Sequence, residues 1–191
     1  MQKADLAFLV DSSASVGPGN FQKLETFLKG AITRLDVGAD KVHVGLMQYG
    51  SYPSIAFPLD MYSNRGDALK AVEKMNFMGG SSDAAGAIQY MTDKMFGSSS
   101  GARGNVPRIA IVLTDGNSNN DASTTSAADK ARQSNIGLIA VGAGPNIQTY
   151  QLNHIADSPD KVITVSDVNN IDSVIDQVLQ KACQSTWVSQ P

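Results

Sequence analysis

Several features are scarce in this 191-residue sequence, and each absence excludes a class of protein. Lysine and arginine number 15 against 18 aspartate and glutamate residues, which gives a net charge of −3. We therefore expect no basic surface for nucleic acid or for an anionic membrane. No apolar run approaches the roughly 20 residues that a membrane-spanning helix needs. No Asn-x-Ser/Thr sequence occurs, so glycosylation gives no clue to the compartment.

Cysteine is almost absent as well. The one cysteine, Cys183, lies in a polar segment directly after the last expected helix. Its position alone leaves two interpretations open, a buried thiol of an intracellular protein and a disulfide to a cysteine outside this segment. The polar surroundings favour the disulfide.

Nearly continuous runs of valine, isoleucine and leucine are present, and such runs are typical of strands buried on both faces of a parallel sheet. The expected strands are Asp5–Val10, Val42–Tyr49, Ile109–Leu113, Ile136–Gly142 and Val162–Val165. The stretch Ser54–Leu59 follows Tyr52-Pro53 and is expected to pair antiparallel at an edge of the sheet.

Segments with the 3.6-residue apolar period of a helix separate these strands. Their apolar faces comprise Phe21, Leu24, Leu28, Ile32 and Leu35; Ala84, Ala87, Ile88, Met91 and Met95; and Ile171, Val174, Ile175, Val178, Leu179 and Ala182. The alternation predicts a doubly wound α/β fold, a mostly parallel sheet with helices on both faces and one antiparallel edge strand. We expect residues 1–184 to form a single domain and residues 185–191 to be a linker or an added tail.

Oxygen-bearing side chains gather in three of the expected loops. One strand runs into Asp11-Ser12-Ser13-Ala14-Ser15, another runs into Thr114-Asp115-Gly116, and Gly79-Gly80-Ser81-Ser82-Asp83 opens a helix. Because ligands of open parallel sheets bind at the carboxyl ends of the strands, we expect these loops to form one site. Both acids should lie at this edge of the sheet and outside the core.

The donor set indicates a hard divalent cation. The candidate ligands are two carboxylates and three hydroxyls, from Asp11, Asp115, Ser13, Ser15 and Ser82. Oxygen donors without cysteine or histidine favour Mg²⁺, with Mn²⁺ or Ca²⁺ as alternatives, over zinc. Two carboxylates balance the charge of the ion and leave a coordination position for an acidic group of a partner.

These residues resemble the metal-ion-dependent adhesion site of von Willebrand factor A domains, a family that includes integrin I domains, matrilins and modules of several collagens. The family's first motif, Asp-x-Ser-x-Ser, matches Asp11, Ser13 and Ser15. Its second motif is a threonine after a glycine pair, here Ser82, and its third is the aspartate of a Thr-Asp-Gly turn, here Asp115. The resemblance covers residues 4 to 183 and is greatest to matrix-type members. Serine at position 82 keeps the hydroxyl but lacks the methyl group that restricts the rotamer.

The resemblance implies a Rossmann-like fold and a secreted, extracellular protein. It implies divalent-cation-dependent binding of a matrix protein, with collagen as the first candidate, through an acidic group that completes the metal shell. The chain would belong to a larger multidomain protein with no enzymatic activity, no nucleic-acid partner and no membrane insertion. As in many family members, Cys183 would form a disulfide.

Two other functions remain open at this point. The chain could be a structural spacer of a matrix protein with a vestigial metal site. It could also be a metal-assisted hydrolase, although neither of its two histidines, His43 and His154, lies in the three loops to act as a general base. Both histidines are expected to be structural.

Two further patterns have structural interpretations. The tripeptide Arg65-Gly66-Asp67 is the sequence that integrins recognise, but it opens an expected helix. Ser63 or Asn64 is then the N-cap, and Asp67 is an acid in the first turn, where the helix dipole favours it. Asp121 is expected to be the N-cap of the helix that follows the Asp115 loop.

Overall fold

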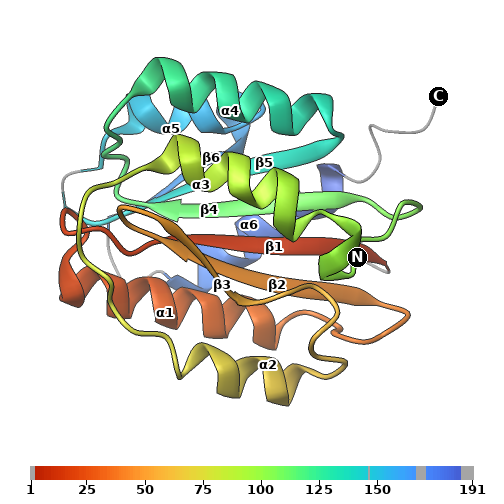
Figure 1. Ribbon diagram of the computed structural model, residues 1–191. Coiled ribbons are helices and arrows are strands. Elements are labelled where there is room, and N and C mark those ends of the chain that lie inside the picture. Colours follow the sequence, from red (N-terminus) through yellow and green to blue (C-terminus); the bar gives the residue numbers. More distant parts are fainter. Residues whose placement is uncertain (1–2, 146, 167–170, 186–191) are drawn as a thin grey trace.

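The computed structural model describes residues 3–145, 147–166 and 171–185, in which six strands form one sheet of order β3-β2-β1-β4-β5-β6 (Figure 1). The strands are β1 (Ala4–Asp11), β2 (Val42–Tyr49), β3 (Pro53–Phe57), β4 (Arg108–Thr114), β5 (Ile136–Ala143) and β6 (Val162–Val165). Every neighbouring pair is parallel except the antiparallel pair β2 and β3. The predicted fold class is therefore confirmed, including the antiparallel edge strand.

Helices cover both faces of the sheet (Figure 1). One face carries α1 (Gly17–Thr33), α2 (Arg65–Val72) and α6 (Ile171–Ser185), and the other carries α3 (Ala84–Tyr90), α4 (Asp121–Gln133) and α5 (Thr149–Ile155). A π-helical turn, η1 (Met91–Met95), continues α3, and two short 3₁₀ turns, η2 (Ser98–Ser100) and η3 (Pro159–Lys161), lie in loops.

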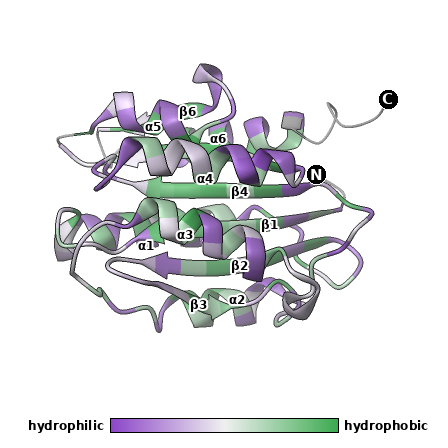
Figure 2. Ribbon diagram, turned by 45° about the horizontal axis from the view of Figure 1, so that its top comes forward, coloured by the Kyte–Doolittle hydropathy of each residue, from purple (hydrophilic) through white to green (hydrophobic). Residues whose placement is uncertain are grey.

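The core has two halves, one on each side of the sheet. Along β1, Leu6 and Phe8 face α1, α2 and α6, whereas Ala7 and Leu9 face α3, α4 and α5. The central strands are hydrophobic along most of their length because both of their faces are covered (Figure 2). Each large apolar side chain buried in this way contributes about 1.5–3 kcal/mol to the free energy of unfolding.

The helix ends confirm one capping prediction and correct another. Asn64 caps α2, because its side chain accepts a hydrogen bond from the backbone N–H of Asp67. The N-cap of α4 is Asn120, which accepts from the backbone N–H of Ser123 at 2.9 Å, so the prediction of Asp121 is wrong. Asn120 has the extended backbone that an N-cap needs, whereas Asp121 is already helical and serves as a first-turn acid.

The sequence predicts that Cys183 follows the last helix. The residue lies inside α6 instead, and its side chain is half-buried. Its disulfide stays a prediction. The expected linker at residues 185–191 lies outside the described residues, apart from Ser185 at the end of α6.

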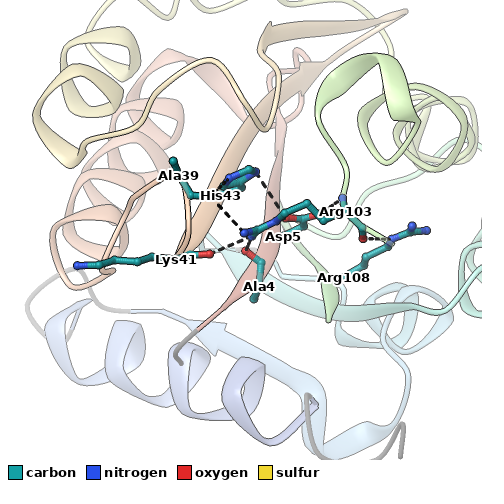
Figure 3. Close-up of polar contacts among 7 residues, drawn as sticks. All are labelled: Ala4, Asp5, Ala39, Lys41, His43, Arg103 and Arg108. Carbon is teal, nitrogen blue, oxygen red and sulfur yellow. Dashed lines mark hydrogen bonds and ion pairs between the residues drawn. The ribbon is translucent and has the colours of Figure 1, made fainter. Parts of the chain in front are cut away.

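A buried ion pair fastens the amino end of the sheet (Figure 3). Asp5, at the start of β1, is fully buried and accepts hydrogen bonds from the backbone N–H of Arg103 at 2.6 Å and from its Nε at 2.8 Å. The guanidinium also donates to the carbonyl oxygens of Ala4 and Lys41, at 2.8 and 2.9 Å. Beside it, Nε2 of His43 lies 2.8 Å from the carbonyl oxygen of Ala39. Arg103 thus ties the loop before β4 to both β1 and β2.

Replacing Arg103 with methionine should lower the free energy of unfolding by about 3–5 kcal/mol, because the Asp5 carboxylate would stay buried without its partner. Lys41→Met is the matched control, since Lys41 pairs with Asp36 at an exposed site and should cost less than about 1 kcal/mol. Urea unfolding of both variants in EDTA measures the difference. Equal losses would show that the pair does not fasten this end of the sheet.

Candidate metal centre

The three predicted loops meet at the carboxyl edge of the sheet, as expected. Asp11 is the last residue of β1, and Asp115 directly follows the end of β4, the neighbouring strand. Ser82 lies in the loop that leads to α3, and its carbonyl oxygen accepts a hydrogen bond from the backbone N–H of Asn119 in the Asp115 loop. The parallel order of the strands therefore brings residues more than 70 positions apart in sequence to one place.

The Asp11 carboxylate is the centre of a hydrogen-bond network. Its Oδ1 accepts from the backbone N–H of Ser13 at 2.9 Å. Its Oδ2 accepts from the hydroxyl of Thr114 at 2.7 Å and, more weakly, from the hydroxyl of Ser82 at 3.4 Å. The Ser13 hydroxyl lies 3.1 Å from that of Ser15, which extends the network to the surface. Asp11 thus contacts Ser13 and Ser82 directly, and Ser15 joins the network through the Ser13 hydroxyl.

Asp115 is positioned by its own loop. Its two carboxylate oxygens accept hydrogen bonds from the backbone N–H and the side-chain amide of Asn117, at 2.9 and 3.0 Å. Its negative charge acts on Asp11, so the two acids are near neighbours. All five candidate ligands are therefore brought together.

The glycine pair before Ser82 gives its loop the shape that reaches the site. Gly79 and Gly80 have φ angles of +73° and +82°, which residues with a side chain rarely adopt. The pair bonds to the Asp11 loop on both sides, because Gly79 N–H donates to the Ser12 carbonyl and the Gly80 carbonyl accepts from Ala14 N–H.

Both acids are buried, which corrects the expectation that they lie outside the core. Asp11 has no exposed surface and Asp115 is 6% exposed, because the loops containing Ser82 and Asn117 fold over them. Burial raises the pKa of Asp11 above its ordinary value of 3.8, against the hydrogen bonds from Ser13 and Thr114, and the charge of Asp115 raises it further.

No positive side chain offsets these charges. Among the described residues, no lysine, arginine or histidine forms an ion pair with Asp11 or Asp115. Nor does any third acid, histidine or cysteine join them, since the described part of the chain contains no cluster of three such side chains. A cation held here would therefore need the serine hydroxyls as ligands.

Comparison with known proteins identifies the family. The family model described as von Willebrand factor type A domain matches residues 5–177. The human collagen alpha-1(XXI) chain is 35% identical over 184 residues, which cover 95% of this chain and 19% of the collagen chain. Chicken (Gallus gallus) matrilin-1 is 34% identical over 181 residues, which cover 94% of this chain and 36% of matrilin-1. The chain belongs to the von Willebrand factor A family.

Solved structures have the same fold. Crystal form 2 of proximal thread matrix protein 1 from the mussel byssus is 25% identical, with a TM-score of 0.88 over 95% of this chain and 48% of that one. A second structure of that protein is described as having a zinc-occupied MIDAS motif, the abbreviation for a metal-ion-dependent adhesion site. It is 24% identical with a TM-score of 0.87, and the match covers 95% of this chain and 48% of that one. The fold likeness confirms the Rossmann-like architecture.

The relatives also confirm the prediction of an extracellular, matrix-type A domain, because collagens and matrilins are proteins of the extracellular matrix. This A domain spans about a fifth of the collagen chain and about a third of matrilin-1. In the described residues, no helix is long and apolar enough to cross a membrane.

Sequence reasoning missed three residues of the site in this A domain. Thr114 donates the shortest hydrogen bond to Asp11, and Asn117 holds both oxygens of Asp115. Tyr49, the last residue of β2, pairs in register with Asp11 and has a fully buried side chain. The neighbours Thr114 and Asn117 could have been found from their place beside Asp115, whereas Tyr49 needed the register of β1 and β2.

The metal-free A domain should lose part of its stability as the pH rises. The pKa of Asp11 is higher in the folded domain than in the unfolded chain, so the unfolded chain releases this proton at a lower pH. The stability contributed by protonated Asp11 is therefore complete below pH 3.8 and is lost as the pH rises through the folded pKa. Asp11→Asn removes this loss, so the variant should gain stability relative to the wild type between pH 4 and 7 in EDTA.

Asp160→Asn is the control for this measurement. Hydrogen bonds from Ser158 and Lys181 lower the pKa of Asp160, so the stability that this acid contributes is complete above pH 3.8 and is lost only as the pH falls through its folded pKa. Between pH 4 and 7 the difference between Asp160→Asn and the wild type should therefore stay constant. Urea unfolding across the pH range compares the two variants. A pH-independent difference between Asp11→Asn and the wild type would contradict the assignment.

The tripeptide Arg65-Gly66-Asp67 should be inert toward integrins, because it forms the first turn of α2. Asn64 binds both the backbone N–H and the carboxylate of Asp67, at 2.9 and 2.7 Å, and Arg65 donates to the carbonyl oxygen of Thr33. Asp67→Glu should leave cell attachment to the immobilised protein unchanged. A loss of attachment that is not accompanied by a lower melting temperature would overturn this interpretation.

Proposed function

We propose that this A domain binds a divalent cation through Asp11, Ser13, Ser15, Ser82 and Asp115, directly or through water. An acidic group of an extracellular matrix protein then completes the metal shell. The observation that carries the proposal is the uncompensated burial of Asp11 beside Asp115. Buried charges in proteins are paired or coordinate metals.

The contrast between the two buried acids of β1 supports this proposal. Asp5 has a permanent cation, the guanidinium of Arg103, at 2.8 Å. Asp11 is equally buried, but the groups that donate to it are neutral N–H and O–H groups. A divalent cation would supply the missing positive charge to Asp11 and Asp115 together.

The donors suit a hard ion. Carboxylate and hydroxyl oxygens favour Mg²⁺, and Mn²⁺ or Ca²⁺ fit the same donor set. The mussel byssus protein is described with zinc in its MIDAS motif, so zinc belongs among the ions to be tested. When bound, the cation supplies a positive centre for an acidic group of a partner, while the chain's own residues hold and orient it.

The partner proposed for the site is a matrix protein, with collagen as the first candidate. The relatives include collagen chains and matrilin-1, and each of these is much longer than this chain. We accordingly propose that the chain up to the end of α6 forms one domain of a larger protein, and that a linker follows this helix. Neither nucleic acid nor a membrane is a proposed partner.

The proposed role is binding without catalysis. His154 contacts Thr125 of α4 at 2.8 Å, and His43 lies beside Asp5 at the amino end of the sheet. His43 thus lies at the end of the sheet opposite the three loops, and the contact of His154 is with a helix residue that is not a candidate ligand. Hydrolysis by a metal-bound water would need a general base that neither histidine is placed to provide.

The test is a melting series of the wild type, Asp11→Ala and Asp115→Ala in EDTA, Mg²⁺, Mn²⁺, Ca²⁺ and Zn²⁺, with binding to immobilised collagen. At a cation concentration 100-fold above the dissociation constant, the wild type should gain roughly 2.7 kcal/mol of stability. Both variants should fold in EDTA, lose most of this gain and lose cation-dependent collagen binding. Alanine at either position leaves a buried cavity that could affect folding. Asp11→Asn and Asp115→Asn preserve the side-chain volume and therefore test the loss of the charge alone.

Two further variants serve as comparisons in this series. Asp40→Asn removes an exposed charge far from the loops and should behave as the wild type. Ser82→Thr should equal or exceed the wild-type cation affinity, because the hydroxyl stays and the added methyl group restricts its rotamer. Identical melting of the wild type and Asp115→Ala in every cation would refute the metal site. A normal cation response without collagen binding would refute collagen alone.

A further inference from the structure

Tyr49 ends β2 on the same face of the sheet as Asp11, its register partner on β1. Both residues are fully buried. The side chain belongs to the half of the core that also contains Leu9, Ala84 and Ile88. The Tyr49 side chain therefore lies in the core next to the candidate metal site.

The phenol hydroxyl at the end of this ring has no hydrogen bond among the described residues, although it is fully buried. The polar groups that act on it are Asp11, Thr114 and Asp115, all at the candidate site. The hydroxyl approaches Asp11 and Thr114 without forming a hydrogen bond of ordinary geometry. An unsatisfied buried hydroxyl is costly, so native structures seldom keep one without a role.

The hydroxyl can act only as a donor toward the acids. Burial raises the pKa of Tyr49 well above its usual range, and the charges of Asp11 and Asp115 raise it further, so the phenol keeps its proton. A neutral phenol beside a carboxylate donates its hydrogen to it.

The existing donors leave room for another at Asp11. The contact from Ser82 to Oδ2 is long, at 3.4 Å, and Ser82 is itself a candidate ligand of the cation. A carboxylate has roughly four lone-pair sites, and three hydrogen bonds reach Asp11 here, from Ser13, Ser82 and Thr114.

We propose that Tyr49 is a positioning residue of the metal site, whose hydroxyl donates a hydrogen bond to Asp11 in the cation-loaded domain and orients that carboxylate. This inference rests on the proposed function. Groups that orient a metal ligand typically change metal affinity 10- to 100-fold when they are removed. Tyr49 would act in this way without touching the cation.

The test compares Tyr49→Phe with the wild type by calorimetric titration with Mg²⁺ and with Mn²⁺, and by melting in EDTA. Phenylalanine keeps the ring and removes only the hydroxyl. The cation affinity should fall about 10- to 100-fold. The melting temperature in EDTA should stay equal or rise, because the hydroxyl that is removed has no hydrogen-bond partner among the described residues.

Tyr62→Phe is the matched control, since Tyr62 packs against Phe57 in the half of the core on the opposite face of the sheet and should leave the cation affinity unchanged. Near-ultraviolet circular dichroism gives a second readout. Cation should change the tyrosine signal of the wild type and of Tyr62→Phe but change it less in Tyr49→Phe.

The outcomes separate this inference from the proposed function. If the wild type binds no cation in the titration, the metal site and the role of Tyr49 both fail. If the wild type and Tyr49→Phe bind cation equally, the metal site stands and the role of Tyr49 is refuted. A lower melting temperature of Tyr49→Phe in EDTA would also refute it, because the hydroxyl would then support the metal-free fold.

Discussion

Asp11 ends the central strand with a carboxylate that is fully buried and that no described lysine, arginine or histidine neutralises. Burying such a charge costs several kcal/mol, and hydrogen bonds from Ser13 and Thr114 return only a part, as the raised pKa of Asp11 shows. The nearby charge of Asp115 adds to the cost. The carboxyl edge of the sheet is arranged around this charge, and a divalent cation is the ion that suits it.

The opposite end of β1 shows what the chain does with a buried acid that has a structural role. Asp5 is as deeply buried, and Arg103 binds it through its backbone N–H and its guanidinium. A side-chain partner is permanent and holds the fold in place. A cation exchanges with solvent and can take a further ligand from outside, so the same residue type at the other end of the same strand suits binding.

The candidate ligands rest on a second layer of residues. Thr114 and Tyr49 come from the strands on either side of β1, and both place a hydroxyl near Asp11. Asn117 does the equivalent for Asp115. Because strand ends are held by the sheet, Thr114 and Tyr49 are more rigid than the loops above them. Cation affinity in this domain would then depend on residues that do not touch the cation.

Much of the fold follows from local sequence patterns. Runs of valine, isoleucine and leucine identify the strands because both faces of the sheet are covered, and the 3.6-residue period identifies α1, α3 and α6. The spacing of Asp11, Ser13 and Ser15, with Ser82 and Asp115 each at an expected strand or helix end, was enough to collect the candidate ligands. The strands, the helices and each loop motif are readable because each depends on residues close together in sequence. The rule that ligands bind at the carboxyl ends of parallel strands then places the three loops at one site.

The tertiary structure alone decided the features that depend on distant segments. Asp5 and Arg103 are 98 positions apart, and no local pattern predicts that they pair. The burial of Asp11 depends on loops from three parts of the chain, so an acid expected outside the core is inside it. The choice of Asn120 over Asp121 as a cap depends on where the backbone turns. Tyr49 reaches Asp11 only through the register of two parallel strands, which is set when the strands pack and not by either segment alone.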